Sequence, residues 1–131
     1  MIAVDTSALV AVLIDEPQRP RIERLLLKTP VVLIGAPTIF ELTMVMRGIG
    51  GPVRAQLAQE MLSGAPFRLV PFDERHLAAA ADAFARFGKG LHPARLNFGD
   101  CMAYAVAKVA ACPLLYKGGD FARTDIAPAL A

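Results

Sequence analysis

The stretch MIAVDTSALV, residues 1–10, places a carboxylate inside an apolar segment. Residues 2–4 have the composition of a short buried strand, and the hydroxyl residues Thr6 and Ser7, which follow Asp5, favour the start of a helix. A buried carboxylate is costly unless it is paired, protonated or bound to a metal ion. Because a helix cap explains Asp5 on its own, its meaning depends on whether similar acids occur further along the chain.

The composition limits the class of protein. The chain has 131 residues, which predicts one domain spanning residues 1–131. Its hydrophobic content is 55%, but no apolar run approaches the roughly 20 residues that span a bilayer, and Asp5 interrupts the N-terminal apolar stretch. We therefore expect a cytoplasmic protein with no membrane segment or signal peptide. The surplus of apolar residues is typical either of a well-filled core or of a surface that binds a second copy or another protein.

The net charge and the cysteines give little further information about the class of protein. A net charge of +2 is compatible with a nucleic-acid partner but does not indicate one. If the segment from Cys101 to Cys112 is read as one helix, the two residues lie about 16 Å apart at 1.5 Å per residue, which is too far for a disulfide. The two histidines and two cysteines do not have the spacing of zinc ligands. We expect both cysteines to be thiols in a reducing compartment.

Strand-like and helix-like segments alternate along the chain. The predicted strands are residues 2–4, 31–35, 67–72 and 113–117. The predicted helices are residues 6–15, 18–28, 37–48, 53–64, 74–87 and 98–110, with a glycine-rich break at 48–52 and a long loop at 88–97. This alternation predicts the α/β class, as a three-layer α/β/α sandwich with a central parallel β-sheet. Reactive groups in such sheets gather beyond the carboxyl ends of the strands.

Most of the 12 acids have a structural explanation. We interpret the following as helix caps or solvated surface residues: Asp15, Glu16, Glu23, Glu60, Asp73, Glu74 and Asp82. The five that remain are therefore the ones to consider for chemistry.

These five acids stand at positions that favour a shared site. Asp5 and Asp120 follow predicted strands, Glu41 lies on an apolar helical stripe, Asp100 stands in the first turn of an alanine-rich helix, and Asp125 comes shortly after Asp120. Taken one at a time, most of these acids are explained by a role as a helix cap or as a turn residue. At one edge of a sheet, however, they would repel one another and stay protonated unless a cation were present. Oxygen ligands suit Mg²⁺ or Mn²⁺, so the pattern predicts phosphodiester hydrolysis by metal-activated water.

Four segments carry a resemblance to a known family. They are AVDTSALVA at residues 3–11, TIFELTMVM at 38–46, LNFGDCMAYAVAK at 96–108 and LLYKGGDF at 114–121. In this order and spacing they resemble the PIN-domain ribonucleases, above all the VapC toxins of bacterial toxin–antitoxin pairs. The resemblance covers almost the whole chain and implies a PIN-like fold.

The resemblance implies a role for each of four acids. Asp5, Glu41, Asp100 and Asp120 would be the catalytic residues and would hold Mg²⁺, for which Mn²⁺ would substitute. Asp5 and Asp100 would ligate the ion, while Glu41 and Asp120 would position or deprotonate the attacking water. Cleavage of RNA would leave a 5′-phosphate and a 3′-hydroxyl. Gly118 stands where many relatives have a further acid, which implies one firmly held ion and a second that arrives with the RNA.

The resemblance also implies roles for the surrounding polar groups. Those that would orient the carboxylates or the water are Thr6, Ser7, Asn97, Thr124 and Asp125. Those that would contact the RNA backbone are Lys117, Lys89, His92 and Arg95.

The implied partners are an RNA substrate, a second copy of the chain and a small VapB-like antitoxin that covers the acids.

Two alternative functions stay open. An aspartyl phosphatase with Asp5 as nucleophile is disfavoured, because Ser7 stands where such enzymes have a second acid and Glu41 would have no role. A catalytically weak PIN-like module that binds protein or RNA is disfavoured by the presence of all four acids.

Overall fold

Four parallel strands form the centre of the molecule within residues 1–130, which are the residues that the computed structural model describes. The strands are β1 (Ile2–Val4), β2 (Val32–Gly35), β3 (Phe67–Val70) and β4 (Leu114–Leu115). They lie in the order β3-β2-β1-β4, so that β1 pairs with β2 on one side and with β4 on the other. All three pairings are parallel, as the alternation of strands and helices predicts.

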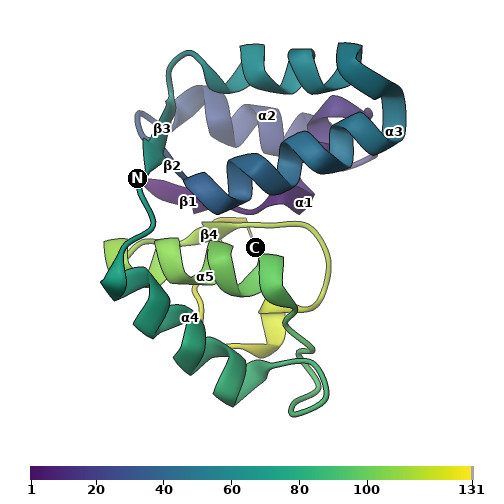
Figure 1. Cartoon of the computed structure of the whole chain (residues 1–131). Coiled ribbons are helices and arrows are strands. Elements are labelled where there is room, and N and C mark those ends of the chain that lie inside the picture. The colour runs from purple at the N-terminus through teal and green to yellow at the C-terminus, as the bar shows by residue number, and fades with distance from the viewer. Residues whose placement is uncertain (131) are drawn as a thin grey trace.

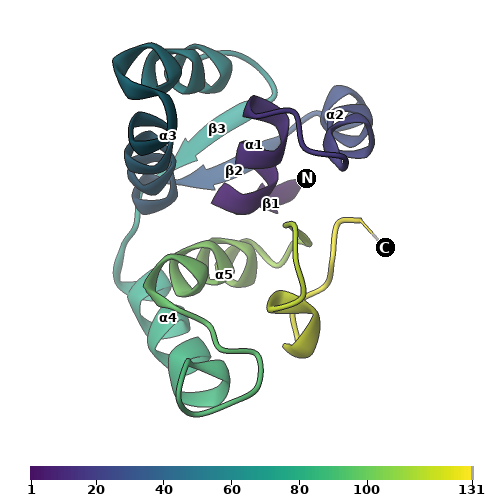
Figure 2. The same ribbon diagram turned by 90° about the vertical axis from the view of Figure 1, so that its right-hand side faces the viewer.

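Helices cover both faces of this sheet (Figures 1 and 2). The helices on one face are α1 (Thr6–Leu13), α2 (Arg19–Lys28) and α3 (Ala36–Leu62). Those on the other face are α4 (Glu74–Phe87) and α5 (Phe98–Ala110), and a short 3-10 helix, η1 (Phe121–Arg123), follows β4. The predicted three-layer fold class is therefore confirmed.

The alternation of side chains along β1 separates two hydrophobic cores. Ile2 and Val4 pack into the core beneath α1, α2 and α3, whereas Ala3 packs into the core beneath α5. The second core also holds Tyr104, which is fully buried. Because successive side chains of a strand point to opposite faces and both faces are covered, the strands read as continuous apolar runs in the sequence.

The connections between strands create a switch point between β1 and β4. The chain passes from β1 to β2 and β3 on one side, and then returns to place β4 on the other side of β1. Sites in open α/β sheets form at such a point, outside the carboxyl ends of the strands. Asp5 directly follows β1, and the segment 116–120 directly follows β4. The topology therefore brings these two segments to the same edge of the sheet.

Two details differ from the sequence-based expectation. The helix that holds Cys101 ends at Ala110, so Cys112 lies beyond it, and both cysteines are free thiols. The predicted glycine-rich break is a kink within α3, at Gly50 (φ −143°, ψ 19°) and Gly51 (φ 70°, ψ −161°). The kink lets the second half of α3 fold back over the sheet (Figure 1).

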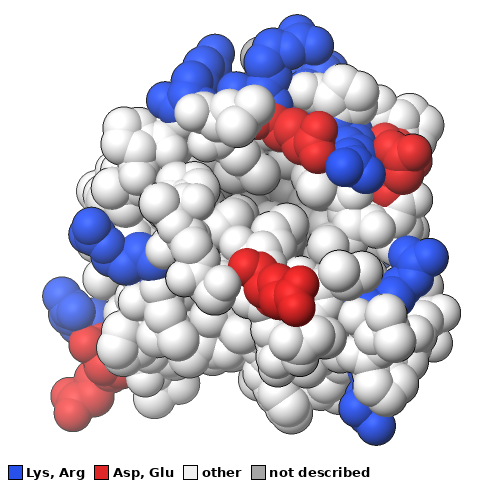
Figure 3. Space-filling view, turned by 90° about the horizontal axis from the view of Figure 1, so that it is seen from above, with Lys and Arg blue, Asp and Glu red and all other residues white. Residues whose placement is uncertain are grey.

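Large apolar side chains remain exposed on α3. Figure 3 shows that the face seen from above is largely uncharged. Among the exposed residues are Phe40, Met44, Ile49, Val53 and Leu57, all from α3. The high hydrophobic content therefore fills two cores and also leaves apolar surface. No helix among residues 1–130 is both long enough and apolar enough to cross a membrane.

The kink provides a test of the fold. We expect Gly51→Ala to lower the free energy of unfolding by about 1–3 kcal/mol, because a φ of 70° with a ψ of −161° is a conformation that essentially only glycine adopts. The matched control is Gly48→Ala in the same helix, where an added Cβ would meet no atom within 4 Å. This control should be neutral or stabilising by up to about 1 kcal/mol. Urea unfolding measures both, and equal stabilities of the two variants would contradict the assignment of the kink.

Candidate active site

Asp5 caps α1 from a buried position. The residue is only 4% exposed, and its carboxylate accepts hydrogen bonds from the Ser7 backbone N–H at 3.0 Å and the Ser7 hydroxyl at 2.6 Å. The Ser7 hydroxyl also accepts a hydrogen bond from the backbone N–H of Lys117 at 3.0 Å. Ser7 therefore connects the end of β1 to the end of β4 and places Asp5 at the switch point.

Glu41 reaches the same region from the second turn of α3. Its carboxylate is half-buried, and the Thr6 hydroxyl donates a hydrogen bond to Oε1 at 2.5 Å. Since Thr6 is the residue after Asp5, this bond holds the Glu41 carboxylate beside the cap of α1.

Asp100 is held at the start of α5 by a reciprocal cap. The Asn97 side chain accepts a hydrogen bond from the Asp100 backbone N–H at 2.9 Å, and Asp100 Oδ2 accepts one from the Asn97 backbone N–H at 3.0 Å. Asp120 stands directly before η1, is exposed, and makes no side-chain capping bond. These two acids therefore differ: Asp100 is fixed by its helix, while Asp120 is open to solvent.

The electrostatics show that Asp5, Glu41, Asp100 and Asp120, hereafter the acidic cluster, influence one another. Burial raises the pKa of Asp5 from 3.8 to about 6; its hydrogen bonds with Ser7 act against this shift, and the charges of Asp100 and Glu41 add to it. Burial also raises the pKa of Asp100, together with the charges of Asp120 and Glu41 and against its bond with Asn97. The charges of these acids therefore act together at Asp5 and Asp100, and this environment disfavours the ionisation of those two carboxyl groups.

The acidic cluster has the chemistry of a divalent-cation site. Its donors are all carboxylate oxygens, which suit Mg²⁺ and Mn²⁺, and a cation would relieve the repulsion that adds to the effect of burial on the pKa values of Asp5 and Asp100. Within the described part of the chain, no three His, Cys, Asp or Glu side chains already form a set that could hold an ion. The carboxylates would thus have to approach one another around a cation.

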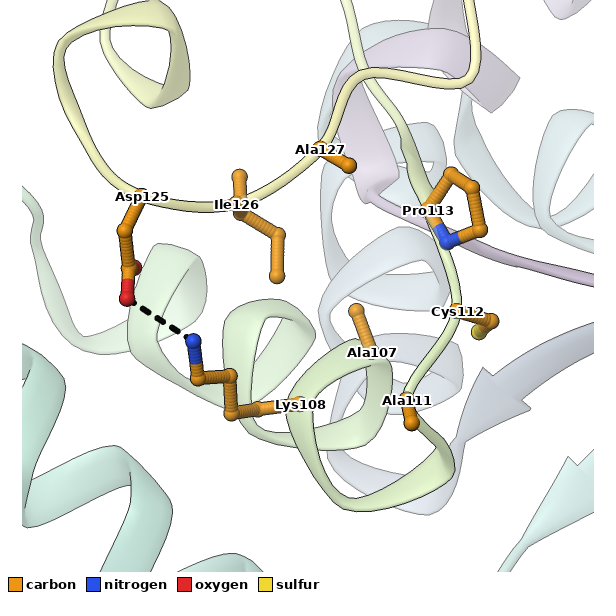
Figure 4. Close-up of a pocket in the computed structure, with 8 residues that line it drawn as sticks. All are labelled: Ala107, Lys108, Ala111, Cys112, Pro113, Asp125, Ile126 and Ala127. Atoms are coloured by element: carbon orange, nitrogen blue, oxygen red, sulfur yellow. Dashed lines mark hydrogen bonds and ion pairs between the residues drawn. The ribbon is translucent and has the colours of Figure 1, made fainter.

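Of the polar residues predicted to orient the acids, Thr6, Ser7 and Asn97 contact them as described above. Asp125 does not, because its carboxylate accepts hydrogen bonds from Tyr104 at 2.6 Å, Lys108 at 2.8 Å and Arg86 at 3.3 Å. Figure 4 shows the contact with Lys108. Burial raises the pKa of Asp125, but these bonds and the charges of Lys108 and Arg86 outweigh it and lower the pKa to about 2. The prediction that Asp125 orients the catalytic acids is therefore wrong.

The surroundings of Asp125 form a separate feature at the opposite end of α5 from Asp100. Figure 4 shows Asp125 and Lys108 lining a pocket with six other residues, and no member of the acidic cluster is among them. The predicted orienting role of Thr124 is also wrong. Its hydroxyl donates to the carbonyl oxygen of Phe121 at 2.7 Å and accepts from the backbone N–H of Ile126 at 3.2 Å, which closes a local turn.

The four residues predicted to contact RNA lie in different environments. Lys89 and Arg95 are exposed on the loop before α5. The His92 ring packs edge-on against Phe87, and its Nδ1 accepts the backbone N–H of Ala94 at 3.0 Å, so this imidazole stabilises the loop.

Lys117 forms an ion pair with Glu16, which the sequence predicts to be a solvated surface residue. The side chain of Glu16 is only 22% exposed, so that interpretation is corrected. Sequence spacing offered no signal for this pair, because the two residues are far apart in the chain and meet only through the fold.

Comparison with known proteins agrees with this geometry. Residues 2–127 match the sequence model of the PIN domain. The chain is 40% identical over 124 residues to the ribonuclease VapC of Mycolicibacterium smegmatis, covering 95% of this chain and 96% of that protein. The chain belongs to the PIN-domain family, within the VapC group. It is also 40% identical over 124 residues to ribonuclease VapC36 of Mycobacterium tuberculosis, which covers 94% of this chain and 89% of that protein.

Solved structures of PIN-domain toxins share the fold. The Mycobacterium tuberculosis toxin VapC20, described as cleaving the sarcin-ricin loop, superimposes over 100% of both chains with a TM-score of 0.81 at 20% identity. VapBC2 from Rickettsia felis, bound to a promoter DNA fragment, matches with a TM-score of 0.75 at 16% identity, covering 98% of this chain and 96% of that one. At such identities these two structures establish the shared fold only.

The raised pKa of Asp5 predicts how stability depends on pH without divalent cations. An unfolded Asp loses its proton near pH 3.8 and folded Asp5 only near pH 6, so the free energy of unfolding should fall as the pH rises between these values. A shift of this size corresponds to about 3 kcal/mol. Asp100 adds to the effect, since its pKa is also raised.

Asp5→Asn should remove most of this slope and be more stable than the wild type at pH 8, because asparagine still caps the helix without a charge. Urea unfolding in EDTA between pH 4 and pH 8 measures the slope, with the exposed Asp82→Asn as the control. Identical pH profiles for Asp5→Asn and the wild type would contradict the burial of a charged Asp5.

Proposed function

We propose that the protein is a metal-dependent endoribonuclease and the toxin of a toxin–antitoxin pair. The observation that carries this proposal is the electrostatic coupling between acids that come from separate segments beside the switch point of the sheet. Asp5 follows β1, Glu41 belongs to α3, Asp100 begins α5 and Asp120 follows β4. The VapC relatives at 40% identity are named ribonucleases, which supports RNA as the substrate class.

The proposed cofactor is Mg²⁺, with Mn²⁺ as a substitute, held by the acidic cluster. When bound, such an ion supplies positive charge to the phosphate and lowers the pKa of bound water. The support lies in the donors themselves: three of the four acids are buried or half-buried, and the pKa values of Asp5 and Asp100 are raised by burial and by the charges of their neighbours.

The surrounding residues would hold the acids in place for this chemistry. The hydroxyls of Thr6 and Ser7 restrain Glu41 and Asp5, and the backbone of Asn97 restrains one oxygen of Asp100. Asp120 is exposed, which suits a group that orients the attacking water or accepts its proton.

The RNA backbone requires positive charge near the scissile phosphate. Lys89 and Arg95 on the loop before α5 are exposed and are the proposed contacts. Lys117 lies closer to Asp120 in the chain, but a phosphate would have to replace Glu16 as its partner. We therefore propose that Lys117 contacts the RNA backbone only when its ion pair with Glu16 opens.

The proposed protein partner is a small VapB-like antitoxin in the cytoplasm. The structural neighbours from Rickettsia felis and Salmonella typhimurium are VapBC assemblies bound to DNA, which supports such a partner. The exposed apolar residues of α3, such as Met44 and Val53, offer surface to an antitoxin or to a second copy of the chain.

A catalytically weak binding module is the second candidate, because no three potential ligands among residues 1–130 are already in metal-binding geometry. The aspartyl phosphatase alternative has less support, since Ser7 is committed to Asp5 and Lys117.

An RNA cleavage assay separates these functions. The chain, purified free of any antitoxin, should cleave structured RNA in Mg²⁺ or Mn²⁺ and lose this activity in EDTA, with 5′-phosphate product ends. Asp5→Asn and Asp100→Asn should each lower the rate by more than about 100-fold, since orienting groups alone contribute about 10- to 100-fold. Asp82→Asn, an exposed acid paired with Arg86, is the control and should cleave like the wild type.

Cleavage that persists in EDTA, or in both site variants, would contradict the metal-dependent mechanism. A wild type that is inactive on a broad panel of RNAs, yet binds RNA or an antitoxin, would favour the binding module.

A further inference from the structure

Gly99, in the first turn of α5, lies against the carboxylate of Glu41. The residue is buried, and in the chain it stands between the N-cap residue Asn97 and Asp100. A Cβ added to Gly99 would overlap the Glu41 side chain, and the three nearest atoms are Oε2, Cδ and Oε1 of that one carboxylate. The Glu41 carboxylate therefore occupies the space that any other side chain at position 99 would need.

The backbone does not explain this glycine. Gly99 lies in a regular helix and is not among the glycines with a positive φ. Alanine would be the better helix former at such a position, because glycine loses more conformational freedom on folding. Glycine at position 99 therefore makes the helix less stable than alanine would. The contact with Glu41 is the feature of the structure that requires a glycine here.

Thr6 holds the same carboxylate from α1. Its hydroxyl donates to Glu41 Oε1 at 2.5 Å, so the carboxylate is confined between α1 and the start of α5. The start of a helix also favours a negative charge through its unpaired N–H groups. Asp100 is the next residue after Gly99, and its pKa is raised in part by the charge of Glu41.

We propose that Gly99 is a positioning residue: its missing side chain admits the Glu41 carboxylate to the start of α5 and so sets the spacing between Glu41 and Asp100 in the acidic cluster. The proposal rests on the proposed metal-dependent cleavage, to which it adds a residue that does not itself bind the cation.

An alanine at position 99 would act on the site and on the fold in different ways. The atoms that it displaces are the flexible end of a glutamate side chain, which can turn away without moving the backbone. The hydrogen bond with Thr6 would break and the acidic cluster would lose one member. The helix itself would gain a better helix former.

The test compares Gly99→Ala with the wild type and with Gly48→Ala, a helical glycine on α3 where an added Cβ meets no atom within 4 Å. Thermal unfolding should show that Gly99→Ala still folds cooperatively, with a Tm close to that of the wild type, because the better helix former offsets part of the lost Thr6–Glu41 hydrogen bond. Its affinity for Mn²⁺, measured by titration calorimetry, and its rate of RNA cleavage should each fall about 10- to 100-fold. Gly48→Ala should keep both.

A double variant isolates the contact. In a Glu41→Ala background the clash is absent, so Gly99→Ala should cause no further loss of Mn²⁺ affinity. If Gly99→Ala alone fails to fold while the double variant folds, the same conclusion follows, because only the Glu41 side chain differs.

Wild-type Mn²⁺ affinity and cleavage in Gly99→Ala would overturn the proposal. So would a crystal structure of this variant in which the Thr6–Glu41 hydrogen bond is retained. If the wild type neither binds Mn²⁺ nor cleaves RNA, the proposed function fails instead, and the crystal structure still decides whether Glu41 has moved.

Discussion

The burial of Asp5 at the carboxyl end of β1 is the constraint on which the rest of the site depends. β1 has a neighbouring strand on each side and helices on both faces, so the residue that follows it is removed from water. Two hydrogen bonds with Ser7 compensate only part of this cost, and the pKa of Asp5 remains raised to about 6. The fold then adds Glu41 and Asp100, which increase the repulsion instead of relieving it.

Two acids of this site are held by caps that also stabilise a helix. Asp5 is the N-cap of α1, and Asp100 completes the capping box of α5. Asp5 and Asp100 therefore cannot be moved without weakening the start of a helix. The contrast with Asp125 is instructive: it accepts bonds from Lys108, Arg86 and Tyr104, and its pKa is lowered to about 2. One end of α5 thus groups like charges, which suits a cation, while the other neutralises a charge, which suits stability.

Much of this arrangement could be predicted from local sequence features. The strands were recognisable as short apolar runs, and Asp5 and Asp120 were singled out because each follows one. Glu41 was recognisable as an acid on an apolar stripe. The errors concern the segment after β4. Nearness to Asp120 in the chain suggested that Thr124 and Asp125 join the site, but η1 turns the chain so that Asp125 meets Lys108 and Tyr104 instead. Direction after a turn is set by tertiary packing and carries no local signal.

The sequence by itself determined the α/β class and the parallel sheet, and it singled out four acids as candidates for the site, because periodicity, caps and strand ends are properties of residues that are neighbours in the chain. Only the tertiary structure decided which charges are neutralised and which are left to repel. Lys117 is paired with Glu16 across the fold. Gly99 of α5 likewise lies against the carboxylate of Glu41 from α3. Both contacts join segments far apart in sequence, and such contacts exist only once the sheet and its helices have packed.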